Sequence, residues 1–238
     1  MMIGKIKQFN FKSLLILNTF ALIVTSYFFK NFICLGVYTL FFFISLFTTK
    51  NGLKTIKKLN LLQNIRTEGP SNHFKKSNTP TMGGIFMIIP FLIFLLIITI
   101  NLGSPKLLLL LFTIFGFFFT GFLDDYLSIK NRKNTGLKSK EKFILQSIIS
   151  IIFIFIAYEN DLINPLIKIS ESWEIDTSIF IFPISFLVLV GISNSVNLTD
   201  GLDGLAAGCS GIVFYGLGTE ILMKEQKELF VFSLLCYS

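Results

Sequence analysis

Long apolar runs are the feature that most constrains how this chain folds. A helix needs about 20 apolar residues to cross a bilayer core. Runs of this kind cover 13–29, 32–48, 82–100, 105–123, 143–158, 179–193 and 205–223, and another begins near Leu229. Hydrophobic residues make up 53% of the chain and the mean hydropathy is +0.72, which excludes an ordinary water-soluble domain. The sequence therefore predicts an all-α, polytopic transmembrane helical bundle, with residues 1–238 forming a single integral membrane domain that is incomplete at its carboxyl end.

The amino-terminal run follows three lysines and could be taken for a secretory signal. No small-residue cleavage pattern comes after it, so we interpret it as a retained membrane segment. Only Lys30 and Asn31 separate it from the second run. The two runs form either a tight hairpin or one span preceded by an interfacial segment.

The charges between the runs predict the topology, because Lys and Arg in short loops stay in the cytoplasm. Residues 49–81 contain seven basic residues and one acid, and residues 124–142 contain six basic residues. Residues 159–178 carry five acids and one lysine, which fits the outer face. We therefore expect cytoplasmic loops at about 49–81, 124–142 and 194–204. The +7 net charge lies largely in such loops, so nucleic-acid binding is not predicted.

The first of three unusual polar segments reads SNHFKKSNTPTMGG over residues 71–84. Thr79 and Pro80 suit the N-cap and first turn of the apolar helix that follows. The free N–H groups of that helix, together with Lys76, predict a seat for an anion such as phosphate. The alternative is an ordinary capped helix start with lysines that only fix topology.

The second segment places Asp124 and Asp125 at the inner end of the 105–123 run. Neighbouring carboxylates repel each other unless a cation is present. Beside phosphates such carboxylates can hold Mg²⁺, or one of them can accept a proton from an attacking group or orient that group. The alternative is a helix end with solvated acids.

The third segment, NSVNLTDGLDGL over residues 194–205, is the most informative. Asn194, Asn197, Asp200 and Asp203 recur every third residue, so successive members share a face in a helical turn. The glycines predict that the later part bends. Amides and carboxylates in this arrangement can bind a uracil or ribose and approach a metal. A polar turn between spans is the simpler alternative.

Two further residues carry weaker signals. His73 is the only histidine, and a lone histidine is more often structural or merely exposed than catalytic. Lys140 can reach a pyrophosphate or an anionic lipid headgroup, although most lysines in this loop act as topology signals.

Together, these three segments closely resemble the phospho-N-acetylmuramoyl-pentapeptide transferases in order and spacing, from about Phe41 onward. The two Asp motifs are shared with a wider superfamily of polyprenyl-phosphate N-acetylhexosamine-1-phosphate transferases, and the TPTMGG segment favours the muramoyl branch. The resemblance implies a Mg²⁺-dependent enzyme of peptidoglycan synthesis in the bacterial inner membrane, multi-pass, with its site facing the cytoplasm. Its substrates would be UDP-N-acetylmuramoyl-pentapeptide and undecaprenyl phosphate, its products lipid I and UMP, and a homodimer is left open.

The resemblance also implies roles for individual residues. Asp124 becomes the candidate base or orienter of the lipid phosphate, with Asp125 as its catalytic partner near the metal. Metal ligands are expected at Asp125 and Asp200, and a further metal ligand of the family is expected beyond Ser238. The substrate-binding candidates are Lys76, Thr81, Lys140, Asn194, Asn197, Asp200 and Asp203.

Three alternatives remain beside this interpretation. The family continues through further spans that bring a metal-binding Asp and a histidine-rich loop. This sequence stops at Ser238, before both, so an inactive truncated membrane protein is one alternative. A sister enzyme that uses UDP-N-acetylglucosamine is the second. A transporter is the third, although transport predicts acids near mid-span and here they gather at inner helix ends.

Overall fold

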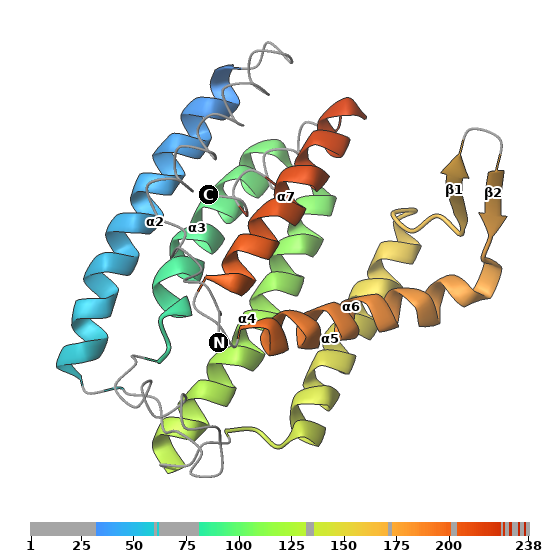
Figure 1. Cartoon of the computed structure of the whole chain (residues 1–238). Coiled ribbons are helices and arrows are strands. Elements are labelled where there is room, and N and C mark those ends of the chain that lie inside the picture. Colours follow the sequence, from blue (N-terminus) through green and yellow to red (C-terminus); the bar gives the residue numbers. More distant parts are fainter. Residues whose placement is uncertain are drawn as a thin grey trace, which may run out of the picture.

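The computed structural model describes residues 32–59, 61, 81–131, 136–170, 173–200 and 204–224, together with residues 226, 229, 233 and 236. Its helices are α2 (Phe32–Lys58), α3 (Gly84–Leu102), α4 (Pro105–Asn131), α5 (Ser139–Glu159), α6 (Ile181–Thr199) and α7 (Leu205–Met223). Helices α2 to α5 pack consecutively, and α6 runs across α5 (Figure 1). The predicted helical bundle is confirmed. The predicted run at 13–29 lies outside the described residues.

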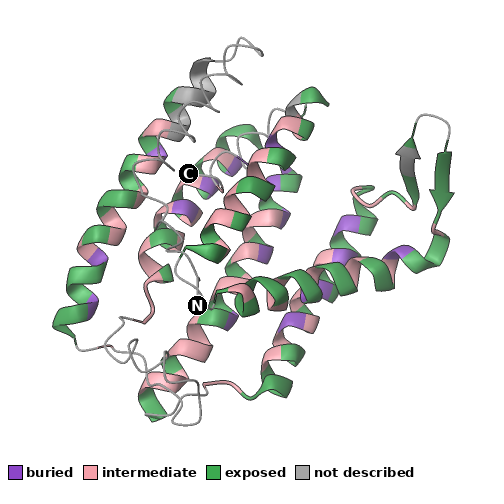
Figure 2. Ribbon diagram, in the orientation of Figure 1, coloured by how far each residue is buried: buried purple, intermediate pink, exposed green. Residues whose placement is uncertain are grey.

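Four helices of the described part of the chain are long and apolar enough to cross a membrane: α3, α4, α5, and α6 with the short 3-10 turn before it. Exposed residues occur along all of the described helices (Figure 2), and many of these residues are large and apolar. In a bilayer such faces contact lipid, and helical hydrogen bonding satisfies the backbone. The chain is therefore a multi-pass membrane protein.

The buried core lies where α2, α3 and α4 meet. Phe41, Phe91, Leu95 and Leu107 form its buried cluster, and the rings of Phe41 and Phe91 meet edge to face with centroids 6.2 Å apart. The Thr48 hydroxyl also donates to the Phe86 carbonyl across α2 and α3, at 2.9 Å. This packing fixes the start of α3 against the end of α2.

The start of α3 differs from the sequence prediction. The helix begins at Gly84 with Gly83 as its N-cap, so the predicted start at Thr79 and Pro80 was wrong. Met82 has a φ of 64°, and this left-handed conformation prevents the helix from extending backward through it. Thr79 and Pro80 themselves lie outside the described residues.

The acidic segment between α5 and α6 contains a β-hairpin that the sequence analysis did not predict. Strands β1 (Leu166–Ser170) and β2 (Trp173–Asp176) pair antiparallel, with Leu166 opposite Asp176. A short 3-10 helix, η2 (Ser178–Phe180), leads from the hairpin into α6. The hairpin lies next to the amino-terminal end of α6 (Figure 1).

Close packing of α2 on α3 gives a stability prediction at Gly52. A Cβ added at Gly52 would overlap the ring of Phe86, whereas one at Gly36 of the same helix would meet nothing within 4 Å. Both alanine substitutions raise helix propensity equally, so the difference in stability between the two variants reports only the steric overlap at position 52. We expect Gly52→Ala to be less stable than Gly36→Ala by about 1–3 kcal/mol. Thermal unfolding in detergent micelles measures this difference, and equal melting temperatures would contradict it.

Candidate functional site

A cavity of about 320 Å³ lies where the start of α3 and the end of α4 meet α5 and α6. Its polar lining comprises Asp124, Asp125, Lys142, Asn197 and Asp200, and its apolar wall includes Met82, Ile85, Phe118 and Phe122. The polar residues come from three consecutive helices, α4, α5 and the end of α6. Packing therefore brings the second and third polar segments together with the residues just before α3.

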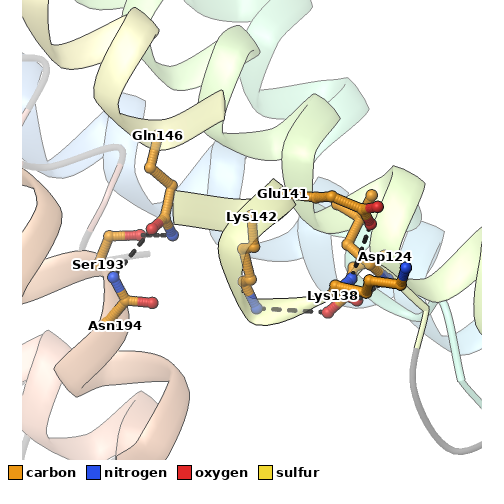
Figure 3. Close-up of polar contacts among 8 residues, drawn as sticks. Asp124, Lys138, Glu141, Lys142, Gln146, Ser193 and Asn194 are labelled. Atoms are coloured by element: carbon orange, nitrogen blue, oxygen red, sulfur yellow. Dashed lines mark hydrogen bonds and ion pairs between the residues drawn. The ribbon is translucent and has the colours of Figure 1, made fainter. Parts of the chain in front are cut away.

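Asp124 is held from the α5 side of the cavity. The Leu137 backbone N–H donates to its Oδ1 at 2.9 Å, and the Lys142 Nζ lies 3.3 Å from its Oδ2 (Figure 3). The Asp124 side chain is 30% exposed and that of Lys142 is 19% exposed, so this ion pair is only partly screened by solvent. Gly136 packs directly on the Asp124 carbonyl group. The Asp124 carboxylate is thus fixed in orientation and paired with the ammonium group of Lys142.

Asp125 is held from the opposite side, by the residues before α3. It is half-buried, and it accepts hydrogen bonds from the Met82 backbone N–H and the Thr81 side chain. The left-handed conformation of Met82 is a strained one for a residue with a side chain, and the bond to Asp125 offsets part of its cost. Thr81 is therefore a direct neighbour of the Asp pair.

The last turns of α6 provide the facing wall. Asn197 and Asp200 line the cavity, and Asp200 is the residue at which α6 ends. Asn194 lies differently, because its Nδ2 donates to Gln146 Oε1 at 2.9 Å and to the Val190 carbonyl at 2.8 Å. Two members of the predicted row line the cavity and one faces α5.

One of the predicted substrate-binding lysines does not line the cavity. Lys140 is exposed on the first turn of α5, away from the lining. Lys142, two residues on, does line it, and sequence reasoning singled out only Lys140. The rotation of α5 against α4 determines which lysine faces the cavity, and this rotation depends on tertiary packing.

Other predictions fall on parts of the chain that the structure does not describe. Lys76, His73 and Asp203 lie outside the described residues. Ser238, the last residue, also lies outside them, and the further metal ligand expected beyond Ser238 is not part of this sequence. That ligand therefore stays a prediction, and only Asp125 and Asp200 of the expected metal ligands can be placed.

The charges of the lining bear on which ligands fit. Three carboxylates and one ammonium group line the cavity. This excess of negative charge repels an anionic ligand unless a cation accompanies it. The oxygen donors of Asp125, Asn197 and Asp200 are of the kind that Mg²⁺ prefers. No cluster of three or more His, Cys, Asp or Glu side chains suited to a metal occurs among the described residues. One or two carboxylates of the lining, together with water and ligand oxygens, would suffice to hold Mg²⁺.

Two family models match the sequence. Residues 107–238 match the glycosyl transferase family 4 model, and residues 76–88 match signature 1 of the phospho-N-acetylmuramoyl-pentapeptide-transferases. The first match covers the Asp pair and the segment at the end of α6. The second covers the residues that hold Asp125.

Curated relatives carry the same name as this signature. A phospho-N-acetylmuramoyl-pentapeptide-transferase of Prochlorococcus marinus strain MIT 9312 is 83% identical over 237 residues, which are 100% of this chain and 66% of the relative. One from strain CCMP1986 is 58% identical over the same shares. One from Bacillus subtilis strain 168 is 36% identical over 81% of this chain and 60% of the relative. The chain thus spans somewhat less than two thirds of the length of these relatives.

The contact between Gly136 and Asp124 gives a prediction about the site's geometry. A Cβ at position 136 would overlap the Asp124 carbonyl oxygen, so Gly136→Ala pushes this turn away from α4. We expect the Leu137 amide to lose its bond to Asp124 and exchange its hydrogen about fivefold to tenfold faster, as for a lost hydrogen bond of about 1 kcal/mol. Hydrogen–deuterium exchange measures this rate. The control is Gly191→Ala, whose Cβ meets nothing within 4 Å. An unchanged rate in Gly136→Ala contradicts the prediction.

Proposed function

The chain belongs to glycosyl transferase family 4, and we propose that its full-length protein transfers phospho-N-acetylmuramoyl-pentapeptide from a UDP donor to undecaprenyl phosphate. The products are lipid I and UMP, and the reaction is the first membrane step of peptidoglycan synthesis. The signature match and the names of the curated relatives support this choice of substrates within the family. The proposed location is the inner membrane, with the cavity open to the cytoplasm, where a nucleotide donor is found.

The observation that carries the proposal is the cavity shared by the Asp pair of α4 and the Asn–Asp row of α6. A phosphoryl transferase needs its acceptor and donor groups within reach of one another. The cavity lies at helix ends, where a lipid phosphate and a water-soluble nucleotide can both arrive. Its apolar wall of phenylalanines suits the first part of a prenyl chain.

The proposed reaction is a phosphoryl transfer with a balanced exchange of bonds. An oxygen of undecaprenyl phosphate attacks the β-phosphorus of the donor and forms a new P–O bond. The bond from that phosphorus to the bridging oxygen breaks, and UMP leaves with the electron pair. Asp124 orients the attacking phosphate or accepts its proton, because it is fixed in direction by Leu137 and Lys142. Lys142 adds positive charge where the phosphate charges gather.

We assign the nucleotide to the α6 wall of the cavity, and the metal to one carboxylate of α4 and one at the end of α6. We assign Asn197 and Asp200 to the donor, and we propose further substrate-binding residues outside the described lining, from the three predicted cytoplasmic loops: Lys76, Thr81, Lys140, Asn194 and Asp203. Asp125 and Asp200 would hold Mg²⁺, whose chemistry is to neutralise the diphosphate. Thr81 contributes in addition by fixing Asp125. The surplus of carboxylates in the lining supports the need for this cation.

A donor-competition assay tests the substrate choice. The full-length protein in membrane vesicles receives undecaprenyl phosphate, Mg²⁺ and equal amounts of two donors, UDP-N-acetylmuramoyl-pentapeptide and UDP-N-acetylglucosamine. We expect lipid-linked product and UMP from the muramoyl donor only, as measured by mass spectrometry of the lipid extract. Consumption of UDP-N-acetylglucosamine alone would refute this substrate choice and identify the protein as the sister enzyme that uses that donor.

The Asp pair gives a mutational prediction. Asp124→Asn keeps the shape of the side chain but removes its charge and most of its basicity, so we expect turnover to fall by about 10²–10⁴-fold. Release of UMP measures turnover, and immunoblotting of membranes measures the amount of inserted protein. Asp161→Asn, an exposed acid after α5, is the matched control and keeps normal turnover. Near-normal turnover in Asp124→Asn refutes the role given to that residue.

A further inference from the structure

The two walls of the cavity are joined through a third helix. Within the described residues, α4 and α6 each pack along α5, whereas any packing between α4 and α6 is slight. The Asp pair of α4 and the Asn–Asp row of α6 nevertheless line one cavity. Their separation and relative rotation are therefore set by α5.

Two side chains on one face of α5 make the connections. Lys142 and Gln146 lie four residues apart, so they share a face of the helix. Lys142 contacts Asp124 of α4, whereas Gln146 reaches α6 (Figure 3). The Gln146 Nε2 donates to Ser193 Oγ at 3.2 Å, and its Oε1 accepts from Asn194 Nδ2 at 2.9 Å. Gln146 is 2% exposed, so both ends of its amide are used inside the protein.

The face of α6 that Gln146 contacts is the face that reaches the cavity. Ser193, Asn197 and Asp200 are spaced by four and then three residues, so they lie in one row along α6. A bond to Ser193 therefore fixes the direction in which Asn197 and Asp200 point. A rotation of α6 that broke this bond would carry both residues away from Asp124.

We infer that Gln146 is a positioning residue, which locks the rotation of α6 against α5 and so holds Asn197 and Asp200 opposite the Asp pair. Apolar packing alone defines this rotation poorly, because between helices in lipid there is little hydrophobic driving force. An unpaired amide buried in the bundle is costly, so the rotation that satisfies Gln146 is preferred. The geometric part of this inference is independent of the proposed function, and its consequence for donor binding rests on that function.

The first experiment measures geometry without any substrate. Spin labels are attached at Lys130→Cys on α4 and Leu198→Cys on α6, two exposed positions, after Cys34, Cys209 and Cys236 are replaced by alanine. Pulsed electron–electron resonance in detergent or nanodiscs then gives the distance distribution between the two helices. We expect one narrow distribution with Gln146 and a broadened or shifted one in Gln146→Leu.

Three variants distinguish the loss of the Gln146 hydrogen bonds from a general destabilisation of the helices. Gln146→Glu has the same length, and its neutral carboxyl can donate to Ser193 and accept from Asn194, so it retains the narrow distribution. Ser147→Ala is the matched control on the same helix, because the Ser147 hydroxyl donates to the Phe143 carbonyl of α5 itself, at 2.7 Å. Ser193→Ala removes one of the two hydrogen bonds of Gln146, so its distance distribution has an intermediate width. This variant replaces Gln146→Leu in the test if Gln146→Leu does not fold. An unchanged distribution in both Gln146→Leu and Ser193→Ala overturns the inference.

The second experiment measures the effect on the proposed reaction. In the full-length protein, Gln146→Leu raises the KM for the UDP donor by about tenfold, as expected from losing two interhelical hydrogen bonds, while kcat changes less. Gln146→Glu restores the KM. If the distance distribution broadens in Gln146→Leu but the unsubstituted full-length protein does not use the muramoyl donor, the positioning role of Gln146 is supported and the proposed function is refuted. Normal donor KM together with a broadened distribution overturns the positioning role.

Discussion

Every peptide group inside the bilayer must find its hydrogen-bond partner within the protein, and the rest of the structure follows from this constraint. The chain satisfies it with long helices, four of which are long and apolar enough to cross within the described residues. Polar chemistry is then confined to the helix ends. The start of α3 and the end of α4 meet α5 and the end of α6, and the candidate cavity lies at that meeting point.

The two adjacent carboxylates of α4 acquire different environments because successive residues of a helix point in different directions. Asp124 faces the start of α5, where an amide and Lys142 fix it. Asp125 faces the residues before α3 and accepts bonds from Thr81 and Met82. Different neighbours can thus give one Asp–Asp pair two separate tasks. The proposed division, with Asp124 toward the acceptor and Asp125 toward the metal, follows this difference.

Sequence patterns did not predict the conformation of two short segments, the one after α5 and the one before α3. The acidic segment after α5 was interpreted by charge alone, although its alternation of polar and apolar residues suits the hairpin that forms between Leu166 and Asp176. The start of α3 was predicted from a good capping pair at Thr79 and Pro80. Met82 in its left-handed conformation instead delays the helix to Gly84, and nothing in the local sequence demands that conformation from a methionine.

The sequence by itself determined the helical membrane architecture, the family and the segments that carry chemistry, because apolar run length and motif spacing are properties of the chain alone. Tertiary structure decided which residues of those segments meet. Lys142 lines the cavity and Lys140 does not, and Asn194 bonds to Gln146 while Asn197 lines the cavity. The physical reason is rotation. The direction in which a helical residue points depends on how its helix is rotated against its neighbours. A single buried side chain such as Gln146 can fix that rotation for the helices that line the cavity.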